Sequence, residues 1–381
     1  MGHSDVAVLG GGVIGLSIAW RAAQAGLAVT VIDPAPGRGA THAAAGMLAP
    51  VAEVSWGEDA LLRLGLAAAE RWPAFARDLT EATGRDLDYA RSGSLIVAVD
   101  PSDHAWLIEL FEFQTRSGLP VTRLRSRECR EAEPLLTPGV RGGVLVEGEG
   151  RVDPRRVVEA LLEALGAAGV ELLREQAQGV VVEQGAATGV RLAGGGIVRA
   201  AHAVLAAGCW SSRIEGLPAG DVPAVRPVKG QTLRLAARGT GPFLRRTLRA
   251  VVHGSRVYIV PRGDGQVVIG ATQEEKGFDD AVTAGGVWEL LRDALAVVPG
   301  LAELDLVESA AGLRPGSPDN APLLGPTSGR GLFLATGHHR NGVLLAPLSA
   351  EIVVELLITG RLPDLAVPFA PDRFQRHSVG S

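Results

Sequence analysis

The sequence predicts an α/β protein (α+β overall) in which two kinds of sheet alternate along the chain. Short apolar runs that end in glycine occur early, in the middle and late, at residues 5–10, 203–208 and 331–337. Such runs are typical of strands in a parallel sheet that is buried on both faces. By contrast, residues 223–269 alternate between apolar and polar positions, which is typical of antiparallel strands.

The composition is that of a globular chain and excludes several classes of function. The 381 residues include 50 glycines, about 13% against the ~7% of ordinary proteins, and 46% are hydrophobic. A net charge of −5 gives no basic surface for nucleic acid, and Cys129 and Cys209 are too few for a disulfide framework. No signal peptide or run of ~18 uninterrupted apolar residues is present. We therefore expect a cytoplasmic protein without contact to nucleic acid or membrane.

The first 33 residues are the most informative segment. Residues 5–9 predict a strand, residues 16–25 have helical spacing, and residues 27–32 predict a second strand. A Gly-x-Gly-x-x-Gly pattern, residues 10–15, separates the first strand from the helix, and Asp33 follows the second strand. This order of elements is typical of a Rossmann-like dinucleotide-binding unit.

Each glycine of that pattern has a physical purpose. Gly10 permits the tight turn, Gly12 lets a pyrophosphate approach the backbone, and Gly15 lets the helix pack on the strand. The N-terminus of the helix directs free amides and its dipole at the phosphates. Asp33 would accept hydrogen bonds from the ribose hydroxyls.

The late segments bear on the type of dinucleotide. A strand followed by glycine recurs at Gly208 and at Gly337, and an apolar helix follows Asn341-Gly342 and runs through Ile358. In a plain NAD dehydrogenase the second half would be a separate catalytic domain, without a late strand and helix that return to the cofactor. The arrangement therefore favours FAD, and a helix that begins at Asn341-Gly342 would stabilise negative charge on a reduced flavin.

These segments divide the chain into two interleaved domains. The polar stretch 60–83 predicts a helix, and the segment 123–133 predicts a solvated helix face because its arginines and glutamates are interspersed. The expected FAD-binding domain comprises residues 1–85, 140–217 and 312–369, the expected substrate domain comprises residues 86–139 and 218–311, and a flexible tail is expected at 370–381.

Taken together, the motifs resemble the D-amino acid oxidase family of flavoproteins, and within it the glycine oxidase branch of the thiamine pathway. The resemblance runs from about Val6 to Phe369. It implies a Rossmann-like FAD-binding domain and a substrate domain with a mixed or antiparallel sheet. Seven motifs in order carry it, at residues 10–15 with Asp33, 41–48, 227–231, 258–262, 270–272, 312–316 and 337–345.

The resemblance implies a site for FAD that draws on the whole chain. Val13 and Ile14 would lie on the pyrophosphate, with Asp33 and Pro34 at the adenosine ribose. A valine of the run 180–182, taken as Val181, would contact adenine, and the three consecutive valines leave the register open. The flavin should be non-covalent, because neither cysteine matches the attachment position of the sarcosine oxidase branch. The other residues implied at the cofactor are Ala40, Thr41, Ala45, Gly46, Met47, Gly208, Gly337, His338, His339, Arg340, Asn341, Gly342, Val343 and Leu344.

For the substrate, the resemblance implies that Arg314 binds a carboxylate, with Tyr258 and Arg340 in the same pocket. A planar guanidinium can hold a carboxylate through two parallel hydrogen bonds. Arg314 stands in a Gly/Pro-rich segment that we expect to be an irregular loop. From composition alone Arg314 would be a surface arginine and Tyr258 a half-buried strand residue. No acidic cluster accompanies His338 and His339, so no metal site is expected.

The implied reaction is the transfer of a hydride from the Cα of a small amino acid to flavin N5. The imine would hydrolyse to glyoxylate and ammonia or an amine, and O2 would be reduced to H2O2. The substrate is either glycine or an N-alkylglycine of secondary metabolism, such as an N-carboxymethyl amino acid, and departures at Trp56, Gln273 and His339 leave this open. The same motifs also fit a D-amino acid dehydrogenase or a non-catalytic FAD-binding protein. Relatives imply a homo-oligomer.

Overall fold

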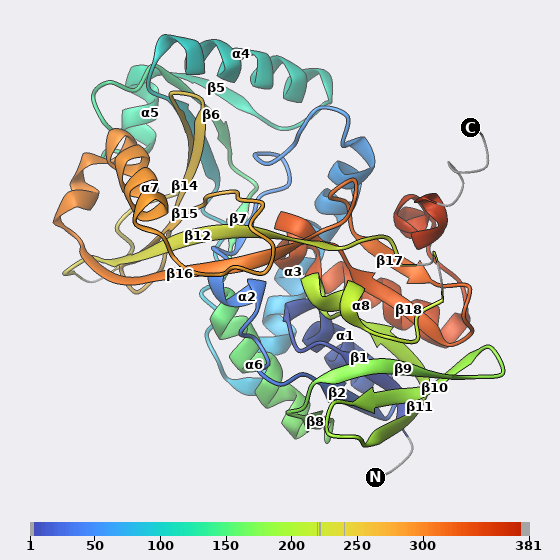
Figure 1. The fold of residues 1–381 in the computed structure, drawn as a ribbon. Helices are drawn as coiled ribbons and strands as arrows, with labels where there is room; N and C mark the ends of the chain where they lie inside the picture. The colour runs from blue at the N-terminus through green and yellow to red at the C-terminus, as the bar shows by residue number, and fades with distance from the viewer. Residues whose placement is uncertain (1–3, 219, 221, 240, 375–381) are drawn as a thin grey trace.

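The chain folds into two parts, each built on an eight-stranded sheet (Figure 1). The computed structural model describes residues 4–218, 220, 222–239 and 241–374. Strands β12 (Arg226–Ala236) and β16 (Asp305–Gly316) are paired along their whole length and run along the boundary between the parts. The predicted combination is confirmed in its main parts: strands β8, β2, β1, β11 and β18 are parallel, and the second sheet is antiparallel except for the parallel pair β13 and β4.

The first sheet has the strand order β17-β18-β11-β1-β2-β8, and the hairpin β9-β10 joins it at β11. Strand β1 lies between β11 and β2 and is parallel to both, with Leu9 beside Leu205 and Ile32. The carboxyl ends of the early and middle strands therefore meet at one edge, where open α/β sheets bind ligands. The strands are β1 (Ser4–Leu9), β2 (Val29–Ile32), β8 (Glu171–Leu173), β9 (Ala177–Glu183), β10 (Ala186–Leu192), β11 (Ile197–Leu205), β17 (Leu323–Pro326) and β18 (Leu332–Thr336).

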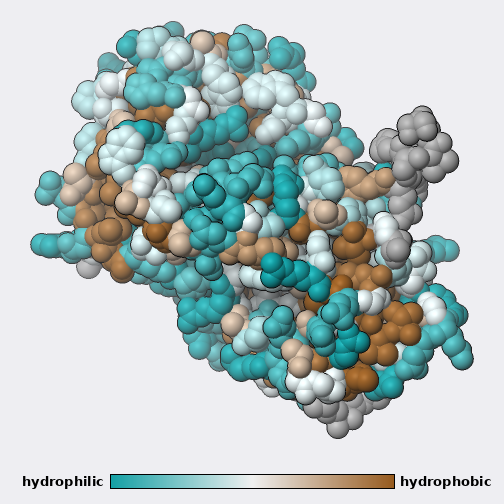
Figure 2. Space-filling model, in the orientation of Figure 1, coloured by the Kyte–Doolittle hydropathy of each residue, from teal (hydrophilic) through white to brown (hydrophobic). Residues whose placement is uncertain are grey.

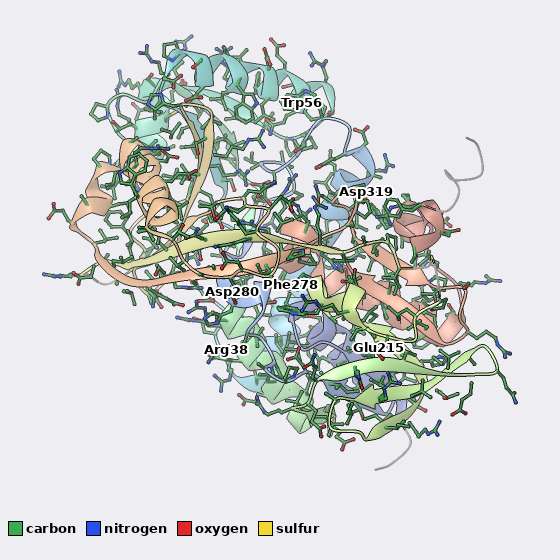
Figure 3. The ribbon with its side chains drawn as sticks, viewed as in Figure 1. Arg38, Trp56, Glu215, Phe278, Asp280 and Asp319 are labelled. Carbon is green, nitrogen blue, oxygen red and sulfur yellow. The ribbon has the colours of Figure 1, made fainter. Side chains whose placement is uncertain are left out.

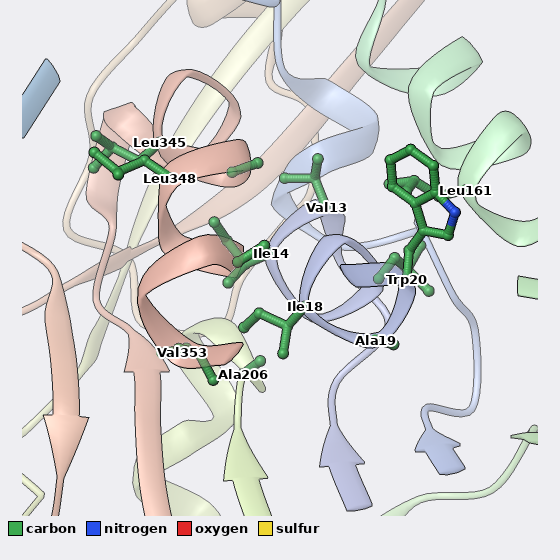
Figure 4. Packing of buried hydrophobic residues seen from close by; sticks show 14 of the residues in the cluster. Val13, Ile14, Ile18, Ala19, Trp20, Leu161, Ala206, Leu345, Leu348 and Val353 are labelled. Atoms are coloured by element: carbon green, nitrogen blue, oxygen red, sulfur yellow. The ribbon is translucent and has the colours of Figure 1, made fainter. Parts of the chain in front are cut away.

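Four helices form the core of this part: α1 (Val13–Gln24), α3 (Asp59–Thr83), α6 (Pro154–Ala167) and α8 (Gly342–Thr359). Ile14 and Ile18 of α1 pack with Leu345 and Val353 of α8 in one buried cluster (Figure 4). By length and composition alone residues 339–359 could cross a membrane, but 61% of the apolar stretch is buried inside the protein. Its continuous apolar character is therefore that of a core helix.

The second sheet has the order β16-β12-β15-β14-β13-β4-β6-β5. Helix α7 (Ala284–Val297) packs on one face, and α4 (Pro101–Arg116) lies beside β4 and β6. Figure 2 shows hydrophobic side chains on the side of α7, where Trp288 is 62% exposed. The remaining strands are β4 (Ser94–Ala98), β5 (Thr122–Arg125), β6 (Gly142–Val146), β13 (Thr247–Val252), β14 (Ser255–Pro261) and β15 (Gln266–Gly270).

Short elements connect the two parts and complete the chain. Strand β3 pairs with β7 in a small sheet of its own. The α-helical elements are α2 (Ala40–Ala43) and α5 (Ser126–Ala132), the strands are β3 (Met47–Leu48) and β7 (Gly150–Arg151), and the 3-10 turns are η1 (Gly208–Arg213), η2 (Pro299–Glu303), η3 (His339–Asn341), η4 (Asp364–Phe369) and η5 (Pro371–Phe374).

Several local predictions need correction. Strand β6 and residues 312–316 belong to the second sheet, because β6 pairs with β4 and the end of β16 pairs with β12. The segment 123–133 is not one solvated helix face, since it begins in β5 and ends at Glu133, a buried carboxylate that accepts the Arg245 backbone N–H at 2.7 Å. The chain also stays packed as far as Phe374, beyond the start of the predicted tail, and residues 375–381 lie outside the described residues.

Candidate active site

One cavity of about 900 Å³ runs between the two sheets, from the loop after β1 to strands β13 and β14. Most of the residues predicted for the cofactor and the substrate line it. These are Gly10, Gly12, Val13, Ile14, Asp33, Pro34, Ala40, Thr41, Ala45, Gly46, Met47, Gly208, Tyr258, Arg314, His338, His339, Arg340, Gly342 and Val343. Five predicted residues lie outside the lining: Gly15, Val181, Gly337, Asn341 and Leu344.

The glycine loop forms the first end of the cavity. Gly10 has φ of +116°, and a side chain there would overlap the backbone of Ala206 on the neighbouring segment. A side chain at Gly15 would overlap the Gly10 carbonyl oxygen, so Gly15 packs the helix on the loop without touching the cavity. Gly12 is different, because a Cβ there would meet only Thr41 Oγ1, at 3.6 Å. The space beside Gly12 is therefore open to a ligand.

The start of α1 and the end of β2 place polar groups around this opening. Gly12 caps α1 without a side-chain hydrogen bond, and the Val13 backbone N–H donates to Thr41 Oγ1 at 3.2 Å. The Asp33 carboxylate accepts the backbone N–H groups of Gly11, at 2.6 Å, and Ala35, at 2.7 Å. Asp33 thus ties the glycine loop to the segment after β2, and helix dipole and carboxylate face the same end of the cavity.

Val181, the residue expected at the adenine, does not line the cavity. Gln176, Ala177 and Gln178, at the start of β9, line the cavity, whereas Val181 lies further along the strand and does not. The sequence could not fix this register because apolar residues continue through the whole of 180–182. Two cations at this end were also missed, Arg38 and Arg213.

The loop that connects β15 and α7 reaches this end of the cavity. The guanidinium of Arg213 lies 3.6 Å from the ring centroid of Phe278, and Trp210 lies 6.1 Å from the same ring. Figure 3 shows Phe278 and Asp280 where the two parts meet, above Arg38. Because Asp280 and Gln273 line the cavity from the second part, both parts contribute to the cofactor end.

The middle of the cavity is formed by α2 and the residues that follow it. The buried Arg262 donates to the carbonyl oxygens of Ala45, at 2.7 Å, and Val152, at 2.8 Å. Burial lowers the pKa of Arg262 to about 10, so it stays charged at neutral pH. Gly46, with φ of +75°, lies so close to Val152 that no side chain fits. These contacts fix the backbone of residues 45–47, which line the cavity.

Helix α8 begins at the opposite wall. Gly342 and Val343 line the cavity, and Asn341 caps the helix without a side-chain hydrogen bond, so free backbone N–H groups face the interior. His338 lies before them, and its Nε2 shares a hydrogen bond of 3.0 Å with Ser349 Oγ. Burial lowers the pKa of His338 to about 3, so the imidazole is a neutral structural group.

Arg314 and Tyr258, the residues expected to bind the substrate, lie close together beyond α8. The part of the cavity around them is called the substrate end here. Arg314 lies on strand β16 opposite Val228, so the irregular loop expected around it is wrong: strand pairing with β12 extends through the Gly/Pro-rich segment. Its Nη1 donates to the carbonyl oxygen of Thr272 at 3.2 Å, and its guanidinium lies beside Tyr258. Among the described residues, no carboxylate pairs with Arg314.

The same strand connects Arg314 to the middle of the cavity. Gly312, two residues earlier on β16, also lines the cavity. A Cβ at Gly312 would lie 2.7 Å from Ala43 Cβ, so the strand packs directly on α2.

Burial raises the pKa of Tyr258, which keeps its hydroxyl protonated and able to donate.

Arg340 and His339 lie next to this pair but differ in their contacts. Arg340 Nη2 donates to Glu58 Oε2 at 3.0 Å, so this arginine holds the segment before α3. His339 has φ of +46°, and both ring nitrogens are buried without a hydrogen-bond partner among the described residues. Burial, and next the charge of Arg314, lowers the pKa of His339 to about 3. A neutral imidazole therefore stands beside the unpaired guanidinium.

The outer wall of the substrate end was not predicted. Arg249 and Arg256 line it from β13 and β14, and Arg249 forms an ion pair with Glu53. Ile96, Trp106 and Leu110 add apolar surface. Trp56, one of the departures that left the substrate open, is 46% exposed, packs on Phe113 and does not line the cavity. Nothing in the sequence marks Arg249 or Arg256 among 37 lysines and arginines; only strand register places them here.

The donor set excludes one class of site and fits another. Within the described residues no group of three or more His, Cys, Asp or Glu side chains could hold a metal ion. Both cysteines are buried and free, and burial raises the pKa of Cys209, which lines the cavity, to about 12. Two uncapped helix N-termini, an open glycine loop and an acid after β2 fit the phosphates and ribose of a flavin dinucleotide.

Comparisons with known sequences agree with this geometry. A family model described as FAD dependent oxidoreductase, DAO, matches residues 5–356. The glycine oxidase of Geobacillus kaustophilus is 34% identical, with 98% of this chain and 97% of that protein covered. The bifunctional protein ThiO/ThiG of Trichormus variabilis is also 34% identical over 98% of this chain, which spans only 56% of that relative's length.

Solved structures give the same result. The crystal structure of glycine oxidase from Geobacillus kaustophilus matches with a TM-score of 0.89 and 33% identity, covering 98% of this chain and 99% of that one. An iminodiacetate oxidase from a Chelativorans species matches with a TM-score of 0.85 and 26% identity, covering 96% and 98%. The chain therefore belongs to the DAO family of FAD-dependent oxidoreductases.

Proposed function

We propose that the chain oxidises glycine or an N-substituted glycine at Cα, with Arg314 binding the substrate carboxylate. One observation carries the proposal: a guanidinium without a carboxylate partner among the described residues lines the cavity beside Tyr258. A guanidinium in such a place binds a carboxylate through two charge-assisted hydrogen bonds. The names of the most similar relatives, two of them glycine oxidases, support a substrate of this size.

The chain's own residues would position the substrate. Arg314 would fix the carboxylate, and Tyr258 would donate to the same group because its hydroxyl adjoins Arg314. The reaction needs the unprotonated amine, and the positive charge of Arg256, which has no acidic partner among the described residues, favours it by disfavouring a further cation nearby. The chemistry that bound FAD would supply is acceptance of the hydride and transfer of the electrons to O2, which would give H2O2. Alignment of this kind can supply several kcal/mol, about 7 or more in favourable cases.

A substituent on the amine has room in the cavity. Ile96, Trp106 and Leu110 extend the wall beyond Tyr258, and glycine alone would leave this surface uncovered. An iminodiacetate oxidase, whose name specifies an N-substituted glycine, is among the structural neighbours. This extension favours N-substituted glycines as a second candidate class.

The test is peroxide production with glycine, sarcosine, D-alanine and a long N-alkylglycine as separate substrates. Preference for sarcosine or the N-alkylglycine over glycine would identify the substituted class. Flavin reduction without peroxide, measured by bleaching under anaerobic conditions, would instead indicate a dehydrogenase. Neither bleaching nor peroxide with any of the four would contradict the proposal and favour a non-catalytic FAD-binding protein.

Three further expectations belong to the proposal. FAD is non-covalent, since Cys209, the cysteine that lines the cavity, is held as a neutral thiol; yellow colour that stays on the denatured polypeptide would contradict this. The chain forms a homo-oligomer in the cytoplasm, which light scattering and cell fractionation test. A role in thiamine biosynthesis is supported by the name of the ThiO/ThiG relatives, and a deletion strain that grows without added thiamine would contradict it.

A further inference from the structure

The outer wall of the cavity carries a charge that the proposed reaction does not need for binding glycine. Arg256 lies on β14 two residues before Tyr258, so both side chains project from the same face of the strand. On β13, Val251 and Arg249 stand opposite Arg256 and Tyr258. All four residues line the cavity, so Arg256 belongs to the same continuous wall as the substrate-binding pair.

The charges of this wall are only partly balanced. Four arginines line the substrate end, and two of them have acidic partners: Arg249 pairs with Glu53, and Arg340 pairs with Glu58. Within the part of the chain that the structure describes, Arg256 and Arg314 form no ion pair with a carboxylate. One cavity thus offers two guanidinium groups without acidic partners, which fits a ligand with two anionic groups.

The surroundings of Arg256 hold its guanidinium in place. The guanidinium carbon lies 5.2 Å from the centroid of the Trp106 ring, a cation–π contact that covers one face of the planar group. The N–H groups on its edge remain available as donors, which is the geometry in which arginine binds a carboxylate. Trp106 itself lines the cavity, so the edge of Arg256 and the apolar wall border the same space.

We propose that Arg256 is a second carboxylate-binding residue, and that the substrate is a glycine whose N-substituent ends in a carboxylate. This rests on the proposed function in that Arg314 holds the glycine carboxylate. Two residues of a strand span about 6.6 Å, so Arg256 stands a short substituent's length beyond Tyr258. The substituent would lie along Trp106, with its carboxylate at the edge of Arg256.

A binding experiment tests this subsite without turnover. Thiodiglycolate has two carboxylates and a sulfur in place of the amine, and (ethylthio)acetate matches its length with one carboxylate. Titration of the holoenzyme, followed by the change in flavin absorbance, should give tighter binding of thiodiglycolate. In Arg256→Gln the ratio of the two dissociation constants should fall about fivefold. This is the upper end of the range of interaction energies measured for partly exposed charge pairs. Arg123→Gln, at the exposed far edge of the same sheet, is the control and should keep the advantage.

Turnover gives the second readout. The ratio of kcat/KM for N-(carboxymethyl)glycine to that for N-ethylglycine should exceed one, and it should fall about fivefold in Arg256→Gln. An equal advantage of thiodiglycolate in the two proteins would overturn the second subsite and leave the proposed function intact. Loss of the response to both ligands in Arg314→Ala, with FAD retained, is expected; if both still bind as in the wild type, the proposed function itself fails.

Discussion

The two ends of the cavity are built by different means. At the nucleotide end the wall is mainly backbone, since Gly12 and the uncapped start of α1 leave amide groups facing the ligand. At the substrate end the wall is mainly side chains from distant strands, with Arg314 on β16 and Tyr258 on β14. The nucleotide end therefore depends on the absence of side chains, and the substrate end on their charge. Substitutions in the glycine loop should therefore affect the binding of FAD, and substitutions at Arg314 or Tyr258 should affect the binding of substrate.

The largest effect is expected at the glycine loop. Gly15→Val places a side chain where the Gly10 carbonyl oxygen lies, and we expect loss of the folded state, more than about 4 kcal/mol. A Cβ at Gly12 meets only Thr41 Oγ1, at an ordinary contact distance of 3.6 Å, so Gly12→Val should fold, but its side chain would fill the approach to the backbone. Circular dichroism and FAD content per chain measure both. If folded Gly12→Val keeps a full complement of FAD, the open space beside Gly12 is not the cofactor site.

The next largest effect is expected for Arg314→Ala. Loss of the carboxylate partner in a buried site should lower kcat/KM about 100-fold or more, while FAD content stays at the wild-type level. Steady-state peroxide production and the absorbance of bound FAD give the two values. Arg314→Lys keeps the charge but not the planar pair of donors, and should recover only part of the activity. An unchanged KM in Arg314→Ala would contradict the carboxylate-binding role.

A pH-dependent effect is expected at the substrate end through Glu149. Its buried carboxylate accepts the backbone N–H groups of Val51 and Ala52, beside Glu53 in the cavity wall. Burial raises the pKa of Glu149 to about 7, above its value in the unfolded chain. The folded state therefore binds more protons between about pH 4.5 and 7, and this group's contribution to stability falls as pH rises through that range.

Glu149→Gln keeps the acceptor oxygen and removes the titration. The variant should be more stable than the wild type at pH 8, by roughly 2–3 kcal/mol, with a smaller difference at pH 5. Thermal unfolding at both pH values measures this. A difference in Tm that is the same at pH 5 and pH 8 would show that Glu149 does not titrate in this range.

The smallest effect is expected for Tyr258→Phe. The variant loses one hydroxyl next to Arg314, a change worth about 1 kcal/mol or about fivefold in kcat/KM. FAD content should be unaffected, which again separates the two ends. The same assay as for Arg314 applies, and a loss as large as that of Arg314→Ala would mean that Tyr258 does more than support the arginine.

The difference between the ends also explains what the sequence could predict. Gly10, Gly12 and Asp33 lie within one strand–helix–strand unit, so their spacing in the chain determines their spacing in space, and the fold class follows from them. Arg249 and Arg256 come to the cavity only through the pairing of β13 with β14. Val181, expected at the adenine, does not line the cavity, and its register stayed open in the sequence because three valines in a row carry no period. Arg314 is predicted by resemblance and not by its local pattern.

Strand β16 has a consequence for how such enzymes diverge. Gly312 packs on α2 and Arg314 projects toward the substrate two residues later, so one stretch of extended backbone sets the spacing between the two. Insertions in this strand, or changes in its pairing, would alter that spacing and so disturb the binding of cofactor and substrate together. Positions 106 and 256 lie on other elements and carry no such constraint. Point substitutions at these positions can therefore change the substrate range without disturbing the strand that sets the spacing between cofactor and substrate.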